Sequence, residues 1–143
     1  MDIKRLFSNK TEYSLISVIF DELPIDNYMD CDSKTLDSIN LIETQNDKIV
    51  YTIKRHIYFE PKCIFDLSVE LKVMKFFNDD VDINEIKDVE WQNTLFEERD
   101  FFSQNVMEEI SLMIAFITKQ SAYPTYITPP VFLIDEDLKE ENS

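Results

Sequence analysis

Only one residue of this chain, His56, is a histidine, which limits the acid–base and nucleophilic chemistry open to the protein. A Ser-His-Asp or Cys-His arrangement needs a histidine beside a nucleophile, with a third group to orient it. His56 lies next to Arg55 in a run that alternates like a β-strand, away from a suitable nucleophile. Carboxylates are so numerous here that neighbouring pairs of them say little about catalysis. The sequence therefore predicts a surface or edge histidine and no enzyme active site.

Two cysteines, Cys31 and Cys63, are far apart in the sequence and lack the spacing of metal ligands. Together with the single histidine they do not make up a usual zinc ligand set. We therefore expect no metal, and two reduced structural thiols rather than a disulfide.

The acidic residues Asp79, Asp80 and Asp82 could in principle bind calcium, which prefers oxygen ligands. An EF-hand loop needs glycine at its sharp turn and glutamate at its twelfth position. Counted from Asp79, the sixth residue is Asn84 and the twelfth is Glu90. Because the glycine is missing, the segment from Asn78 to Glu90 is interpreted as a solvated acidic loop.

The chain contains no glycine. Phosphate-cradling loops, dinucleotide fingerprints and nucleophile elbows use glycine where the backbone is strained or must approach a ligand closely. The composition therefore argues against those enzyme classes, and we expect no cofactor.

Acidic residues outnumber basic ones: the chain has 29 Asp and Glu and 14 Lys and Arg, for a formal net charge of −15. A field of that sign repels nucleic-acid phosphates and anionic lipid, and favours basic or unfolded cationic partners. We therefore expect no nucleic-acid ligand.

The length of 143 residues and the 44% hydrophobic content suit one compact domain. Neither a signal-peptide pattern nor a run approaching the roughly 20 apolar residues of a membrane span is present. We expect a cytoplasmic protein that does not insert into membranes.

Two runs alternate between apolar and polar residues with the period of a β-strand. Their apolar residues share one side of each strand: Tyr51, Ile53, Ile57 and Phe59 between Ile49 and Phe59, and Phe65, Leu67, Val69, Leu71 and Val73 between Cys63 and Phe76. The break at Glu60-Pro61-Lys62 suits a hairpin, so the two strands should be antiparallel neighbours.

Two weaker runs, from Tyr13 to Phe20 and from Leu36 to Thr44, are also interpreted as strands. The first has a two-sided pattern that a helix could share. The segment from Asp21 to Lys34 contains Pro24 and several acidic residues, and is interpreted as a loop.

An amphipathic stretch from Ser103 to Lys119 predicts a long helix. One stripe of it would lie on the sheet and contains Val106, Ile110, Met113, Ile114 and Ile117. Leu112, Ala115 and Phe116 lie on a different side, and because a helix with two apolar faces needs two partners, we infer an oligomer interface there or packing on another helix. The alternative is a set of isolated surface hydrophobes, which are common.

This order of four strands, a helix and a Pro-rich extended segment resembles that of the SecB-type protein-export chaperone family and its smaller SecB-like relatives. The likeness is most specific from Ser111 to Leu133, where the helix leads into Tyr123-Pro124, Tyr126-Ile127 and Pro130-Val131-Phe132-Leu133. Two residues depart from the family pattern: Ser121 replaces a glycine before the aromatic–Pro pair, and Leu112 replaces a glutamate of the export chaperone.

The resemblance implies one α+β domain spanning residues 1–143, with a core from about 13 to 133 and an acidic tail from about 135 to 143. Its sheet has four antiparallel strands, followed by the long helix and the Pro-rich crossover segment. It further implies a homo-oligomer, a dimer or a tetramer built as a dimer of dimers, joined through sheet edges and long helices.

The resemblance also implies that extended polypeptide binds in apolar grooves between the sheet and the crossover. Candidate groove residues are Tyr123, Tyr126, Ile127 and Phe132, with Trp91, Phe76 and Phe77 as further candidates. For each of them ordinary core packing is the alternative. In the export chaperone an acidic sheet face contacts the translocase motor, and Asp66 and Glu70 are the matching candidates here.

Three functions follow from these expectations. The first is a SecB-like chaperone or holdase that binds unfolded polypeptide and performs no chemistry, with a possible link to protein export. The second is a SecB-like adaptor or structural oligomer devoted to one partner, such as a toxin–antitoxin, phage or regulatory component. The third, an enzyme on the same fold, is the least favoured, although fold alone does not decide function.

Overall fold

Four long antiparallel strands form one sheet in the computed structural model, which describes residues 2–24, 30–121 and 124–134. They are β1 (Phe7–Glu22), β2 (Asp32–Thr44), β3 (Lys48–Glu60) and β4 (Phe65–Phe77), in the spatial order β1-β4-β3-β2. The 3-10 helix η1 (Ile3–Leu6) precedes β1, and α1 (Ile83–Lys87), α2 (Trp91–Glu97), α3 (Arg99–Phe102) and α4 (Val106–Lys119) follow β4. The α+β class with a four-stranded antiparallel sheet is thus confirmed.

The alternating runs form β3 and β4, paired as antiparallel neighbours. One face of the pair is the centre of the hydrophobic core, where Ile53, Ile57, Leu67 and Leu71 have no exposed surface. The opposite face carries the intervening polar residues. Period-two alternation therefore predicted which side of the sheet is covered.

The outer strands are longer than the sequence indicates. The predicted loop from Asp21 to Lys34 is too long, because β1 continues to Glu22, opposite Phe65, and β2 begins at Asp32, opposite Glu60. Hydrogen bonding to a long neighbouring strand extends both ends, although their residues are polar and exposed. Edge strands do not need an apolar pattern to pair.

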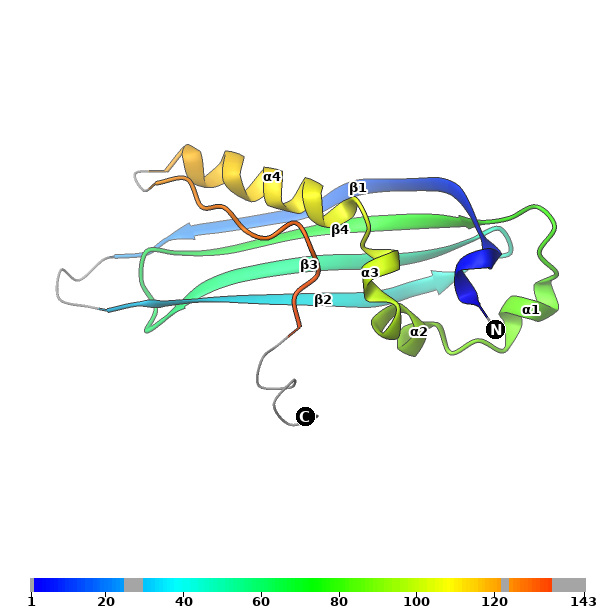
Figure 1. Cartoon of the computed structure of the whole chain (residues 1–143). Helices are drawn as coiled ribbons and strands as arrows, with labels where there is room; N and C mark the ends of the chain where they lie inside the picture. The colour runs from blue at the N-terminus through cyan, green and yellow to red at the C-terminus, as the bar shows by residue number, and fades with distance from the viewer. Residues whose placement is uncertain (1, 25–29, 122–123, 135–143) are drawn as a thin grey trace.

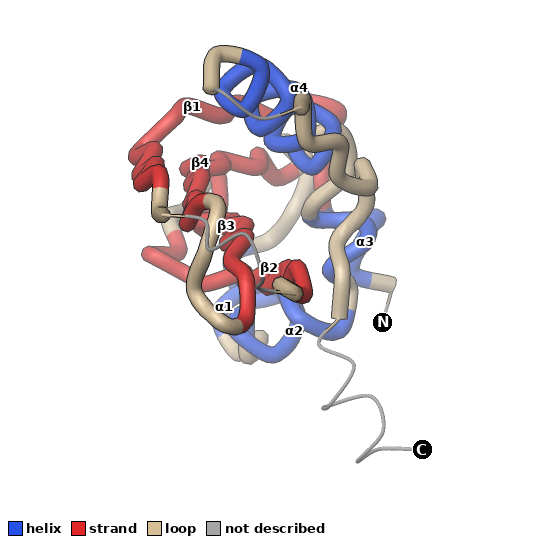
Figure 2. Tube along the Cα trace, turned by 90° about the vertical axis from the view of Figure 1, so that its left-hand side faces the viewer, coloured by secondary structure: helices blue, strands red, loops and turns tan. Residues whose placement is uncertain are grey.

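One face of the sheet is covered by α4 and by the segment 124–134, which we call the crossover. Figure 1 shows α4 running along β1 and β4, with the orange crossover turning back across β3 and β2. In the turned view of Figure 2, α4 and α3 lie on the same side of the curved sheet. The predicted long helix is confirmed, but it begins at Val106 rather than Ser103.

The acidic segment after β4 is not wholly a loop, which corrects the sequence-based expectation. Asp82 caps the short helix α1: its side chain accepts from the N–H of Asn84, and the Glu85 side chain reaches back to the N–H of Asp82. Asp-x-x-Glu is the signature of such a capping box. Among the described residues no cluster of three or more His, Cys, Asp or Glu could hold a metal ion.

The helix α2 is attached to the edge strand β2 by one side chain. Gln92 donates to the carbonyl oxygen of Ile39 at 3.0 Å and accepts from the N–H of Leu41 at 2.7 Å. A primary amide can replace a neighbouring strand in this way, so this stretch of the edge is closed to further pairing. Within the described ranges, no helix is both long and apolar enough to cross a bilayer.

Cys31 and Cys63 form a disulfide, so the expectation of two reduced thiols is wrong. Their separation of 32 residues in the sequence concealed that they are neighbours in the fold. Cys31 immediately precedes β2 and Cys63 lies in the β3–β4 hairpin, and both positions lie at one end of the sheet. The disulfide therefore joins the β1–β2 connection to this hairpin.

Candidate peptide-binding surface

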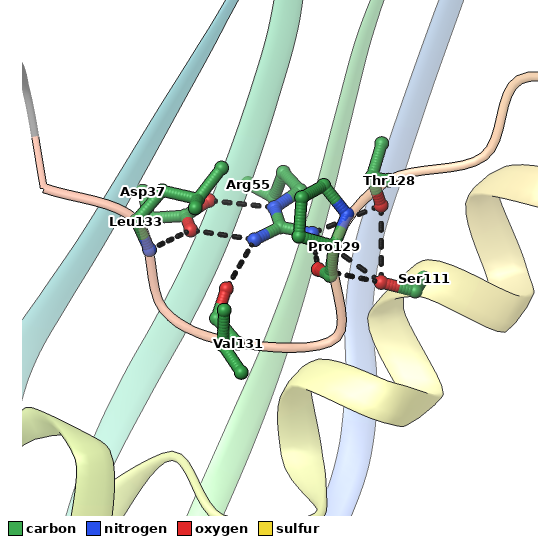
Figure 3. A network of polar contacts seen from close by, with 7 residues as sticks. All are labelled: Asp37, Arg55, Ser111, Thr128, Pro129, Val131 and Leu133. Carbon is green, nitrogen blue, oxygen red and sulfur yellow. Dashed lines mark hydrogen bonds and ion pairs between the residues drawn. The ribbon is translucent and has the colours of Figure 1, made fainter.

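A fully buried charge, that of Arg55, lies beneath the crossover. Arg55 is in the middle of β3, in phase with Ile53 and Ile57, and has no exposed surface. Its guanidinium meets the carboxylate of Asp37 on β2 through two hydrogen bonds, from Nε at 2.8 Å and from Nη2 at 2.7 Å (Figure 3). Because both side chains are fully buried, water does not screen this pair.

The same two residues hold the backbone of the crossover. Arg55 donates to the carbonyl oxygens of Pro129 at 2.6 Å and Val131 at 2.7 Å, while Asp37 accepts from the N–H of Leu133 at 2.8 Å. The three contacts involve every second residue from Pro129 to Leu133, where the crossover bends at Pro130 and Val131 (Figure 3). The ion pair therefore fixes the position of the crossover on the sheet.

The helix α4 is tied into the same network. The hydroxyl groups of Ser111 and Thr128 lie 3.0 Å apart, Ser111 Oγ donates to the Pro129 carbonyl at 3.0 Å, and Arg55 donates to Thr128 Oγ1 at 2.9 Å. We call Arg55, Asp37, Ser111 and Thr128 the Arg55 clamp. It joins β2, β3, α4 and the crossover through polar contacts that are buried at Asp37 and Thr128 and partly exposed at Ser111.

The clamped crossover buries some of its side chains against the sheet and exposes others. Thr128 and Phe132 are buried, whereas Ile127 is 75% exposed and Val131 is 56% exposed. Tyr126 is half-buried, with its ring edge-on to Phe65 at 5.7 Å between centroids. The result is a fixed segment that presents large apolar side chains to solvent.

The predicted groove residues are not brought together at one place. Tyr126, Ile127 and Phe132 all belong to the crossover, but the side chain of Phe132 is buried in the core. Trp91 and Phe77 pack against each other, with ring centroids 5.7 Å apart, in a buried aromatic cluster with Phe7.

Two further groove candidates are placed elsewhere. Phe76 is on the opposite face of β4, where the ammonium groups of Lys10 and Lys48 lie over its ring at 4.3 and 5.0 Å. Tyr123 lies outside the described residues, as does the predicted acidic tail from Asp135 to Ser143.

The predicted oligomer face of α4 is open to solvent. Leu112 is 65% exposed and Phe116 is 68% exposed, while Ala115 beside them is partly buried. Together with Leu15 and Val18 of β1, these two large side chains line a cavity of about 390 Å³ whose other walls are also apolar. This surface is continuous with β1, an outer strand of the sheet.

The uncovered face of the sheet carries charges of both signs. His56 Nε2 and Asp66 Oδ1 lie 2.8 Å apart, and the imidazole donates to the carboxylate in the tautomer that carries its proton on Nε2. Glu70 lies opposite Lys54 in the register of β3 and β4. Because basic groups stand beside both carboxylates, this face is less acidic than the net charge suggests. The assignment of Asp66 and Glu70 to a partner surface stays a prediction.

Arg55 and Asp37 are the residues that sequence reasoning missed. A signal was present, because Arg55 falls in the buried phase of β3, between Ile53 and Ile57. A charged residue at such a position is expected to be paired, since burial of an isolated charge is very unfavourable. The sequence did not indicate that its partners would come from β2 and the crossover.

Comparison with known proteins shows the fold. No protein-family model matches this chain, and no curated protein matches its sequence. Among solved structures, it is similar to the SecB-like chaperone Rv1957 of Mycobacterium tuberculosis, which was solved in complex with a ChAD peptide from the Rv1956 HigA1 antitoxin. The two are 10% identical, with a TM-score of 0.64 over 82% of this chain and 86% of that chain. The chain therefore has a SecB-like fold.

Proposed function

We propose that this protein binds extended or unfolded polypeptide without catalysing a reaction, in the manner of a chaperone or holdase. The observation that carries the proposal is the crossover, whose backbone accepts hydrogen bonds from the buried Arg55 while Ile127 and Val131 are exposed. A preorganised apolar surface binds a chain with less loss of conformational entropy than a mobile one. Tyr126 and Ile127 would make the primary contacts.

The other groove candidates take different places in this proposal. The buried side chain of Phe132 would support the surface from below, and Tyr123, which lies outside the described residues, stays a candidate contact. Trp91 and Phe77 are buried in the core and would not touch a bound chain. Phe76 lies on the opposite face of the sheet and would contribute only if a bound chain extends around the molecule.

The charge of the protein supports the same kind of ligand. A net charge of −15 attracts segments that are rich in Lys and Arg and keeps a protein with exposed apolar side chains soluble. Affinity for cationic clients should accordingly fall as salt is raised, whereas binding to the apolar surface should not.

A second function, an adaptor dedicated to one partner, is favoured by a specific observation. The similar structure of Rv1957 contains a peptide from an antitoxin, so a SecB-like chaperone of that kind binds a defined protein segment. A pull-down would separate the two proposals, because an adaptor retains one partner at high affinity and a holdase retains many weakly.

We also propose that a second copy of this chain covers Leu112 and Phe116. These side chains, Ala115 and the exposed apolar residues of β1 form one surface, and large apolar patches on soluble proteins mark interaction sites. A dimer that pairs the β1 edges would extend the sheet and bury this surface; a tetramer would need a further interface.

Two further parts of the proposal concern protein export and the location of the protein. Docking of an export motor at Asp66 and Glu70 rests on the resemblance alone. A cytoplasmic location remains our expectation, but the Cys31–Cys63 disulfide weighs against it, because cytosolic thiols are kept reduced.

An aggregation-suppression assay with several unrelated unfolded proteins tests the main proposal. Tyr126→Asp and Ile127→Asp should reduce protection, because each places a charge on the apolar surface. Thr125→Asp, at an exposed neighbouring position, is the matched control and should protect like the parent protein. If the parent protein protects none of the clients, the holdase proposal fails; if both test variants protect fully, the location of the surface is wrong.

A further inference from the structure

A lysine interrupts the apolar face of β4 at the end that lies farthest from the disulfide. Lys75 is in phase with Val73 and Phe77, which are both buried, and stands opposite Thr11 of β1. Its side chain is partly buried, and this burial lowers the pKa of Lys75 below its ordinary value. A charged group in this position needs compensation from its surroundings.

The compensation that Lys75 receives is incomplete. Its ammonium group donates to Thr11 Oγ1 at 3.2 Å and lies 4.6 Å from the centroid of the Phe101 ring. Within the described part of the chain, no carboxylate forms an ion pair with Lys75 or with Lys4. In a protein with twice as many acidic as basic residues, a partly buried ammonium without an acidic partner is unexpected.

The ammonium borders a cavity. The cavity measures about 270 Å³ and lies between η1, the start of β1, the end of β4 and the residues that precede α4. Lys4 lines it as well, and the Lys4 ammonium lies 5.9 Å from the same Phe101 ring. Hydroxyl and amide groups of Ser8, Thr11, Asn9, Gln104 and Asn105 complete the polar lining, and the described residues that line the cavity include no Asp or Glu.

We propose that this cavity binds a small oxyanion, a phosphate or carboxylate group, between the ammonium groups of Lys4 and Lys75. Two cations, hydroxyls and amide N–H groups are the donors that such a group prefers. The anion would supply the counter-charge that Lys75 lacks, in a partly enclosed site where electrostatic attraction is stronger than in bulk water. The surrounding negative charge repels anions, so local donors rather than the overall field determine binding here.

The test measures thermal unfolding of the full chain in increasing inorganic phosphate, in sodium acetate, and in sodium chloride at equal ionic strength. A ligand that binds only the folded protein raises the unfolding temperature as its concentration rises. We expect phosphate or acetate to stabilise the protein beyond the chloride series. A response to acetate identifies a carboxylate site, and a response to phosphate alone identifies a phosphate site.

Variants assign the effect to the cavity. Lys75→Met should weaken binding about tenfold or more, because it removes a charged hydrogen-bond donor, and Lys4→Met should weaken it less. Lys72→Met, on the same strand but the opposite face, is the matched control and should bind like the parent protein. Equal stabilisation of the parent protein and Lys75→Met, or no stabilisation beyond chloride, would overturn the proposal.

A second measurement does not depend on the stability of a variant. Backbone amide resonances of Thr11, Lys75 and Gln104 should shift with phosphate or acetate in the parent protein, and resonances near Lys72 and Lys54 should not. Shifts spread evenly over surface lysines would show non-specific association and would contradict the site.

Discussion

Arg55 and Asp37 form a two-pronged ion pair in which Nε and Nη2 of the arginine each meet one carboxylate oxygen, at 2.8 and 2.7 Å. Fork-to-fork geometry is the strongest arrangement of these two groups. Because the pair uses only Nε–H and one N–H of Nη2, Nη1 can donate to the carbonyl oxygen of Pro129 and the other N–H of Nη2 to that of Val131. A single pair thus connects sheet stability to the position of the crossover.

Removal of one partner should destabilise the fold strongly. Arg55→Met leaves the Asp37 carboxylate buried without its counter-ion, and such a change costs about 3 to 5 kcal/mol in the free energy of unfolding. Urea denaturation monitored by circular dichroism measures it. Lys54→Met, the adjacent residue on the other face of β3, is the matched control and should change stability by less than about 0.5 kcal/mol. Similar losses in both variants would show that Arg55 is screened by water after all.

Removal of both Arg55 and Asp37 should distinguish their effect on the stability of the fold from their effect on the position of the crossover. Replacing Arg55 and Asp37 together by Leu leaves no uncompensated charge, so much of the lost stability should return. The crossover still loses three backbone contacts, to Pro129, Val131 and Leu133. Hydrogen exchange should therefore quicken at the Leu133 amide while β3 and β4 stay protected. Unchanged exchange at Leu133 would mean that packing of Phe132 alone holds the crossover.

The central strands and the long helix could be predicted from the sequence because each carries its own periodicity. In β3 and β4, alternation at every second residue follows directly from burial of one face. The ends of β1 and β2 could not be predicted in this way, since pairing with a neighbouring strand decides them and the exposed residues at Glu22 and Asp32 carry no pattern.

The site was predicted less well than the fold, for a physical reason. Phe76, Phe77 and Trp91 are aromatic residues of similar character in the sequence, yet one lies on the open face of the sheet and two lie in the core. Side-chain type does not reveal which aromatic residues a tertiary fold leaves exposed. The same limit applies to Cys31 and Cys63, whose proximity depends on how two distant connections meet at one end of the sheet.

Charge placed on the outer face of α4 should disrupt self-association. If a second copy covers this face, Leu112→Asp and Phe116→Asp each place a carboxylate in an apolar interface and should shift the protein to the monomer. Multi-angle light scattering measures the mass in solution. Asn93→Asp adds the same charge on an exposed part of α2 and should leave the mass unchanged. A parent protein that is monomeric at high concentration would contradict the interface.

Loss of the disulfide should destabilise the fold, because the unfolded chain then gains conformational entropy. The bond closes a loop with a sequence separation of 32 residues, and the entropy of closing a loop of that length corresponds to about 3 to 4 kcal/mol. We expect a loss near that size for the double variant Cys31→Ser and Cys63→Ser, measured by urea denaturation without reductant. Thiol titration of the unfolded, unreduced parent protein should find no free thiol. Two free thiols, and equal stability of the parent protein and the variant, would show that the cysteines are not paired.

The free energy of unfolding should fall at alkaline pH because the hydroxyl of Tyr51 is buried. Its hydroxyl donates to the carbonyl of Phe102 at 2.7 Å, and burial raises the pKa of Tyr51 above its ordinary value. The folded state therefore keeps the proton that the unfolded state loses above about pH 10, so stability is intact below that pH and falls as the pH rises further. Between pH 10 and 11 this group alone should remove about 1 kcal/mol of stability.

Lys75, whose pKa is lowered, acts in the opposite direction, so the comparison must be made against Tyr51→Phe. That variant should be less stable at neutral pH, because it lacks the hydrogen bond, and should lose stability less steeply above pH 10. Parallel pH profiles would mean that the folded protein ionises Tyr51 as readily as the unfolded chain does.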